Sequence, residues 1–226
     1  MDRVTDALAR VRERLDAALA RAGRPPDSAL LVAVSKRQPA SAIREAYAAG
    51  QRDFGEGYAQ ELRDKARELS DLPGLRWHFV GHLQLNKAKY VAPVAVLVHA
   101  VDETGAAREL ARRAPGPLRC LVEINAGSEP QKHGVAPADA ASLCRDLLAL
   151  PGLALAGLMC LPPAGRPARP FFAELRALRD SLARELSAPL PELSMGMTED
   201  FEEAIAEGAT LVRVGTAIFG PRPRAG

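Results

Sequence analysis

Apolar residues recur every three or four positions near the start of the chain and then give way to short continuous apolar runs. The first pattern predicts an amphipathic helix that ends near Gly23, with its apolar face made by Val4, Leu8, Val11, Leu15 and Leu19. Residues 30–35 follow and read LLVAVS, which is typical of a strand buried on both faces. A second helix is predicted over residues 41–49, with Gly50 as its C-cap.

The same alternation of strand and helix continues along the chain. Strands are predicted at residues 30–35, 53–55, 76–80, 95–101, 119–124, 153–159, 192–194 and 211–214, and helices in the intervals include 58–69, 136–150, 171–186 and 199–207. Eight such units predict an α/β fold, a single (β/α)8 TIM-type barrel with an extra N-terminal helix, in one domain over residues 1–226. An open doubly wound sheet is the alternative, but no GxGxxG follows the first strand.

Bulk composition narrows the class of protein. The 226 residues are 47% hydrophobic, which suits one packed domain, and 30 basic against 28 acidic residues leave a formal charge of +2. This balance favours neither nucleic acid nor a membrane surface as a partner. No apolar run reaches membrane-span length, and no signal-peptide pattern opens the chain. Because Cys120, Cys144 and Cys160 are odd in number and widely spaced, we expect free thiols and a cytoplasmic location.

Small residues and hydroxyls stand at the ends of the last two predicted strands. Ser194 ends the seventh strand, with Gly196 two residues on, and Gly215 and Thr216 follow the eighth. In barrels of this type the loops after strands seven and eight commonly hold a phosphate, bound by backbone N–H groups and hydroxyls. The alternative is that the glycines only form turns and the hydroxyls only cap helices. The two interpretations are about equally supported when both segments are considered together.

Lys36 directly follows the first predicted strand. A lysine at this place would point into the barrel mouth, where burial lowers the pKa of the amine and lets it condense with an aldehyde. A solvated lysine at a strand end is the alternative. A phosphate site across the same mouth favours the first interpretation, because an aldehyde-bearing phosphate cofactor needs both groups.

Arg213 shares a strand face with Gly215, so it too is expected to face the ligand. An arginine inside a barrel needs an acceptor, which is either a pyridine nitrogen or a neighbouring carboxylate. The four histidines show no metal-ligand spacing, and we predict no metal site. Of these, His78 and His99 are expected to fill the core.

Several segments together carry a family resemblance. They include LVAVSKRQPASAI around Lys36, GQRDFGEGYAQE at 50–61, WHFVGHLQLNK at 77–87, LSMGMTEDFEEAI at 193–205 and RVGTAIFGPR at 213–222. The chain resembles the pyridoxal phosphate homeostasis protein family over nearly its whole length. The family usually has an asparagine where this chain has Gly57, so any contact from that side chain is lost here.

The resemblance implies a barrel like the N-terminal domain of alanine racemase and pyridoxal 5'-phosphate (PLP) as cofactor. It implies a Schiff base at Lys36 and an Arg213 that faces the pyridine nitrogen. The remaining cofactor-binding positions that it implies are Asn86, Ser194, Gly215 and Thr216.

We expect a PLP-binding protein of intracellular cofactor homeostasis, with no catalytic residues of its own. Racemases of this barrel type use a second, β-rich domain, and only six residues follow Gly220 here. In addition, Arg213 cannot give up its proton, so the ring nitrogen would stay unprotonated. We expect a monomer that exchanges PLP with apo PLP-dependent enzymes. The alternatives are a PLP-dependent amino-acid racemase and a cofactor-free scaffold protein.

Overall fold

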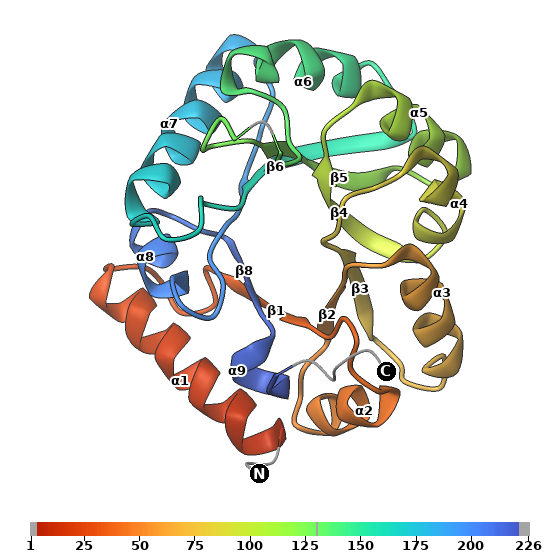
Figure 1. The fold of residues 1–226 in the computed structure, drawn as a ribbon, viewed down its shortest axis with the longest axis vertical. Coiled ribbons are helices and arrows are strands. Elements are labelled where there is room, and N and C mark those ends of the chain that lie inside the picture. Colours follow the sequence, from red (N-terminus) through yellow and green to blue (C-terminus); the bar gives the residue numbers. More distant parts are fainter. Residues whose placement is uncertain (1–3, 130, 222–226) are drawn as a thin grey trace.

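Eight parallel strands close into a barrel in the order in which they occur along the chain (Figure 1). The computed structural model describes residues 4–129 and 131–221. The strands are β1 (Leu30–Val34), β2 (Asp53–Glu56), β3 (Arg76–Phe79), β4 (Ala95–Val101), β5 (Leu118–Ile124), β6 (Leu153–Cys160), β7 (Glu192–Ser194) and β8 (Leu211–Val214). The ring closes where β8 pairs with β1, and the predicted TIM-type barrel is confirmed.

Helices surround the barrel as an outer ring (Figure 1). They are α1 (Val4–Arg21), α2 (Ala40–Ala48), α3 (Ala59–Glu68), α4 (Ala88–Val91), α5 (Thr104–Arg113), α6 (Ala140–Leu148), α7 (Arg169–Glu185), α8 (Phe201–Ala206) and α9 (Thr216–Phe219), with short 3-10 turns η1 (Leu85–Lys87) and η2 (Pro137–Asp139). The extra N-terminal helix α1 packs against α2, α8 and α9. Its predicted apolar face is the buried one.

Some predicted element boundaries were wrong. The helix predicted over 136–150 is divided, because the segment opens with the 3-10 turn η2 before α6 begins at Ala140. The helix predicted from residue 199 begins at Phe201, which leaves Thr198 in a turn. Gly50 has φ +87°, as a residue just past a helix end requires.

The hydrophobic core has two parts. A large cluster fills the space between strands and helices, and a small one fills the barrel itself with Val32, Leu97, Ala100, Leu121, Ala156, Met159 and Leu211. Buried polar groups share the interior with this small cluster, among them His78, His99 and Arg213. Within residues 4–129 and 131–221, no helix combines the length and the apolar character that crossing a membrane needs.

Candidate functional site

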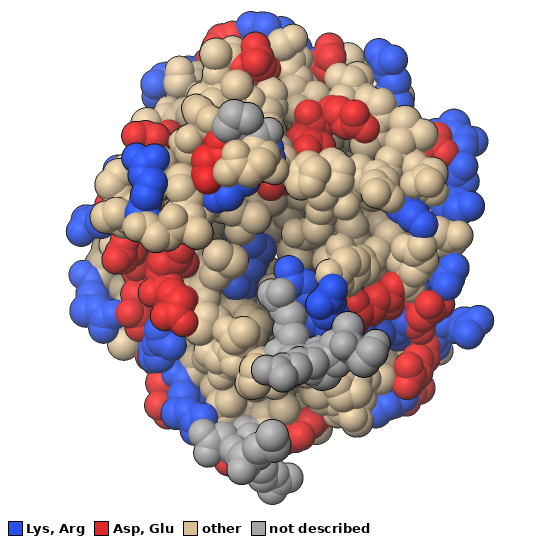
Figure 2. Space-filling model, viewed as in Figure 1, with Lys and Arg blue, Asp and Glu red and all other residues tan. Residues whose placement is uncertain are grey.

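A cavity of about 300 Å³ opens at the carboxyl ends of the strands. Its lining includes Lys36 after β1, Arg213 in β8, and Gly215 and Thr216 directly after β8. Figure 2 shows the hollow at the centre of the molecule, with basic side chains inside it. Four of the six residues predicted to bind the cofactor are therefore brought together in one cavity.

Lys36 is half-buried at the cavity wall, and its aliphatic stem runs beside Gly57. A Cβ at position 57 would lie 3.0 Å from Lys36 Cδ, which is tighter than an ordinary van der Waals contact. An asparagine at position 57 would require the lysine stem to shift by a few tenths of an ångström. The glycine therefore leaves the stem of Lys36 the space that it occupies.

Arg213 is 5% exposed and lies inside the barrel with its side chain toward the cavity. It donates from Nη1 to Ser194 Oγ and from Nη2 to the Cys160 carbonyl oxygen (3.0 Å). Burial lowers the pKa of the guanidinium. Among the described residues no carboxylate forms an ion pair with it, so the ion-pair alternative for this arginine is not what the structure adopts.

The other two predicted residues lie elsewhere. Ser194 is fully buried below the cavity, where its hydroxyl contacts Arg213 and His99 rather than the cavity wall. Asn86 lies exposed in η1 and is not among the lining residues. The hydroxyl of Thr198, which the sequence did not single out, also lies at the cavity wall, where it accepts a hydrogen bond from Thr216 Oγ1 at 3.0 Å.

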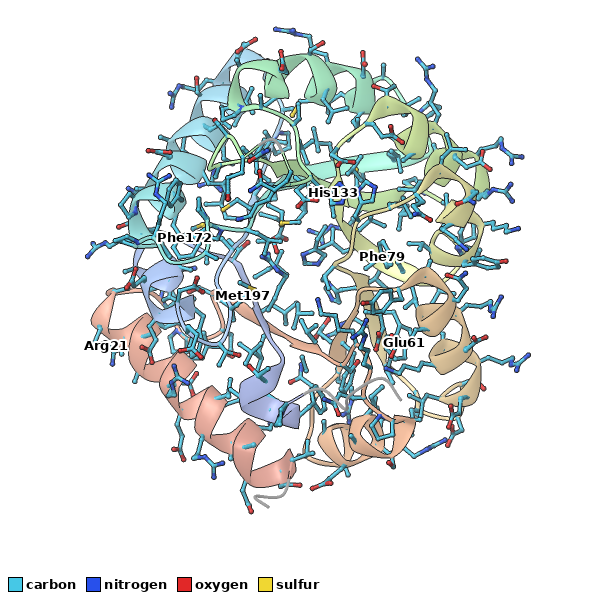
Figure 3. All side chains as sticks on the ribbon, in the orientation of Figure 1. Arg21, Glu61, Phe79, His133, Phe172 and Met197 are labelled. Carbon is cyan, nitrogen blue, oxygen red and sulfur yellow. The ribbon has the colours of Figure 1, made fainter. Side chains whose placement is uncertain are left out.

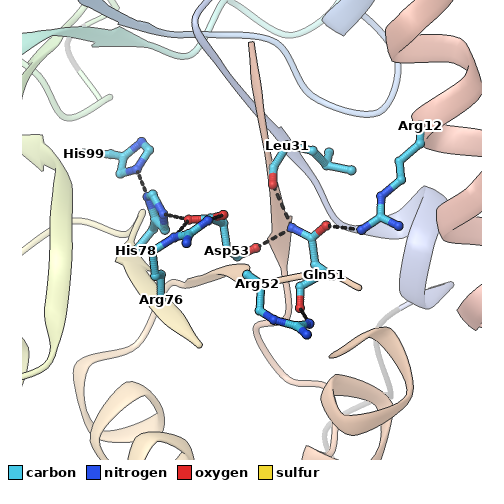
Figure 4. A network of polar contacts seen from close by, with 8 residues as sticks. All are labelled: Arg12, Leu31, Gln51, Arg52, Asp53, Arg76, His78 and His99. Carbon is cyan, nitrogen blue, oxygen red and sulfur yellow. Dashed lines mark hydrogen bonds and ion pairs between the residues drawn. The ribbon is translucent and has the colours of Figure 1, made fainter. Parts of the chain in front are cut away.

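A buried chain of polar side chains crosses the barrel from Asp53 to Ser194. Asp53 Oδ1 lies 3.0 Å from His78 Nε2, and His78 Nδ1 lies 3.0 Å from His99 Nε2 (Figure 4). His99 Nδ1 then lies 2.7 Å from Ser194 Oγ. Arg213 donates to the same hydroxyl, so it forms the upper end of the chain.

The protonation states of Asp53 and His99 constrain the hydrogen bonds of this chain. Burial raises the pKa of Asp53, but hydrogen bonds from His78 and Arg76 outweigh it and leave this pKa lowered, so the carboxylate only accepts. Burial and the charge of His78 hold the pKa of His99 well below its usual value, so His99 is neutral. A neutral imidazole donates from one ring nitrogen and accepts at the other, so the hydrogen bonds of His99 to His78 and to Ser194 run in the same direction along the chain. The sequence identified these histidines only as core, because the chain depends on contacts between separate strands.

Two buried carboxyl groups lie at other strand ends. Glu56 accepts hydrogen bonds from Ser35 Oγ and Lys65 Nζ, both at 2.7 Å, and burial raises its pKa to about 7 against the effect of Lys65. Glu123 in β5 also has a pKa raised to about 7, first by burial and then by the charge of Asp102. Glu123 lines a second, smaller cavity that shares Leu161 with the first.

The Glu123→Gln variant is expected to be more stable than the parent protein at pH 8 and little changed near pH 4.5. The folded-state pKa of about 7 exceeds the ordinary value of 4.5. The folded state therefore favours protonated Glu123. The contribution of this group to stability is fully present below about pH 4.5 and is lost as pH rises through 7. Chemical denaturation from pH 4.5 to 8 measures the difference. The exposed Glu103→Gln is the control, and a constant difference between Glu123→Gln and the parent across this range would contradict the expectation.

Comparison with known proteins places this chain in a family. The family model described as the N-terminal domain of alanine racemase matches residues 7–223. The pyridoxal phosphate homeostasis protein of Aquifex aeolicus (strain VF5) is 44% identical over 223 residues, covering 96% of this chain and 97% of that protein. The chain belongs to the pyridoxal phosphate homeostasis protein family. The relative of the same name from Pseudomonas aeruginosa is also 44% identical, over 98% of this chain and 97% of its own length.

Solved structures agree with this membership. PipY of Synechococcus elongatus PCC7942, solved with PLP bound, is 41% identical with a TM-score of 0.81, covering 93% of this chain and all of that one (100%). Alanine racemase from Corynebacterium glutamicum matches with a TM-score of 0.69 at 18% identity, over 98% of this chain and 62% of that one. The second likeness shows the fold alone. The resemblance read from the sequence is confirmed.

Proposed function

We propose that this chain binds PLP at the barrel mouth and serves PLP homeostasis by holding or delivering the cofactor. The observation that carries the proposal is one cavity lined by Lys36, Arg213, Gly215 and Thr216. PLP supplies an aldehyde that bonds to amines and a phosphate that needs hydrogen-bond donors. Membership of the family and the PLP-bound PipY relative support the same conclusion.

The residues present fit each part of such a cofactor. Lys36 supplies the amine. Gly215 lets the backbone pass close to β1, because a Cβ there would lie 3.0 Å from the Val34 carbonyl oxygen. Its N–H and the Thr216 and Thr198 hydroxyls are the proposed phosphate donors, in the turns after β8 and β7 that line the same cavity as the lysine. Arg213 has five N–H donors and uses two in the hydrogen bonds described above, so it has others to direct at a ring nitrogen.

Ser194 and Asn86 keep proposed roles of a different kind. Ser194 is proposed to hold the guanidinium of Arg213 in place from below, since its hydroxyl is engaged by Arg213 and His99. Asn86 is proposed to reach a bound ligand only if η1 moves toward the cavity, since it lies outside the lining.

We propose further that the protein does not catalyse a reaction on amino acids. Because Arg213 donates and keeps its proton, it leaves a facing ring nitrogen unprotonated, which weakens the stabilisation of negative charge on which racemases and decarboxylases depend. We also propose a cytoplasmic monomer in which residues 1–226 form one cofactor-binding domain, with apo PLP-dependent enzymes as its partners.

A PLP-dependent racemase is the second candidate, and one observation favours it. Glu123 is buried, has a pKa raised to about 7, and lines the cavity adjoining the proposed cofactor site. A group with that pKa is suited to move a proton at neutral pH.

A transfer and turnover assay separates these candidates. Protein loaded with PLP and freed of excess cofactor is mixed either with L-alanine or with the apo form of a PLP-dependent aminotransferase. We expect aminotransferase activity to appear and no D-alanine to accumulate. The non-catalytic proposal would be overturned if D-alanine formed at enzyme-like turnover and if this activity were lost in each of the two single variants, Lys36→Ala and Glu123→Gln.

A further inference from the structure

The four histidines form two pairs with opposite surroundings. His78 and His99 are buried, and each ring nitrogen of both has a hydrogen-bond partner. His82 and His133 are exposed at the barrel mouth, and within residues 4–129 and 131–221 no hydrogen bond engages their ring nitrogens. The second pair therefore keeps lone pairs available to a ligand.

A carboxylate completes a cluster with this second pair. Ligand atoms of His82, Asp102 and His133 all lie within 4.8 Å of one another, and His82 Nδ1 is 3.4 Å from Asp102 Oδ2. Two ligands of a tetrahedral zinc ion, each bound at about 2.0–2.1 Å, lie roughly 3.4 Å apart. The separation of His82 and Asp102 already matches that value.

Three different segments deliver these side chains. His82 follows β3, Asp102 follows β4, and His133 lies in the loop after β5, at one rim of the mouth. Figure 3 places His133 beside β4 and β5, on the other side of the barrel centre from Met197, which lines the proposed cofactor cavity. The cluster is therefore distinct from the site at Lys36.

The loop that carries His133 is fastened to the barrel. Val135 exchanges backbone hydrogen bonds with β5, accepting from Asn125 N–H (3.0 Å) and donating to the Glu123 carbonyl oxygen (2.9 Å). Gly134 has φ +103°, and its N–H donates to Asp102 Oδ2 at 3.3 Å. This contact links the backbone next to His133 directly to the carboxylate of the cluster.

One adjustment brings the second imidazole into position. The two rings are stacked, with centroids 3.6 Å apart and planes at 10°, so their in-plane lone pairs run parallel instead of converging. The torsion that turns a histidine ring is broad and roughly two-fold, and an exposed ring turns at little cost. Rotation of His133 out of the stack would direct one of its nitrogens toward the space beside His82 and Asp102.

We propose that His82, Asp102 and His133 form a binding site for a divalent transition-metal ion of the zinc type. Two imidazoles and one carboxylate supply three ligands, and an exposed fourth position stays open to water or to an exogenous ligand. The three cysteines do not compete for the metal, because they are buried and burial raises their thiol pKa values to about 11 or 12.

Competition against a chromophoric zinc chelator tests the site in the full chain without an affinity tag. We expect one equivalent of Zn²⁺ to bind at pH 7.5, weaker binding of Co²⁺, no binding of Mg²⁺, and loss of Zn²⁺ affinity as pH falls below 6, where imidazoles protonate. His82→Phe and His133→Phe keep an aromatic ring for the stack, and Asp102→Asn keeps an acceptor for Gly134. Each is expected to weaken Zn²⁺ binding by at least about tenfold.

Glu103→Gln is the matched control, since it removes a neighbouring exposed carboxylate outside the cluster and is expected to bind Zn²⁺ as the parent does. Unchanged melting temperatures without metal show that the variants are folded. Parent protein that binds no Zn²⁺, or ligand variants that bind it as tightly as the Glu103→Gln control, would overturn the proposal.

Discussion

Replacing Lys36 with alanine is expected to abolish the covalent retention of PLP. Lys36 lines the cavity with Arg213, Gly215 and Thr216, and among the lining residues within 4–129 and 131–221 it is the one lysine. The phosphate donors remain in Lys36→Ala, and weak, non-covalent binding of PLP should therefore persist. Gel filtration followed by a visible spectrum measures what each protein retains, with nearly all bound PLP lost from the variant.

Lys89→Ala is the control for this experiment. Lys89 is exposed on α4, where its ammonium lies 5.0 Å from the centre of the Tyr90 ring. Removing it should leave PLP retention at the parent level. Equal retention by Lys36→Ala and the parent would mean that a different lysine holds the cofactor, and the cavity would lose its proposed role.

The second large effect is expected on stability, from Gly157→Ala in β6. A Cβ at this position would lie 1.9 Å from the carbonyl oxygen of Glu192, in the strand that pairs with β6 at that residue. Because the obstacle is backbone, β6 and β7 must separate locally, and β7 has only three residues with which to hold its place. We expect a loss of about 3 kcal/mol in the free energy of unfolding, or roughly 6–12 °C in melting temperature.

Gly116→Ala provides the comparison, since a Cβ there meets nothing within 4 Å. Its melting temperature should stay close to that of the parent. If Gly157→Ala melts at the same temperature as Gly116→Ala, the close approach of β6 and β7 does not limit the stability of the protein.

The barrel could be predicted from sequence because each of its units carries a local signal. The continuous apolar run before Lys36 corresponds to β1, and residues 95–101 correspond to β4 with the same boundaries. Ends of elements were less predictable where tertiary contacts decide them. The helical pattern over 136–150 gives no sign that its first turn is 3-10, and β6 continues to Cys160 because it pairs with Ile124 of β5.

The candidate site was predictable only where residues sit at strand ends. Lys36, Arg213, Gly215 and Thr216 follow from their positions on β1 and β8, since parallel strands end at the same rim. The contact between Ser194 and His99 depends on how far each side chain stands below the rim, which strand order alone does not give. The grouping of His82 with His133 joins loops 51 residues apart, as their numbers show, and no spacing rule reaches that far.

Borohydride reduction of the PLP-loaded protein, followed by peptide mapping by mass spectrometry, tests the proposed attachment of the cofactor most directly. Reduction makes the bond between a lysine amine and the cofactor permanent, so the modified residue can be identified. We predict a single modified peptide containing Lys36, from the loop that follows β1. Label at Lys65, Lys87, Lys89 or Lys132 with Lys36 unmodified would contradict the account.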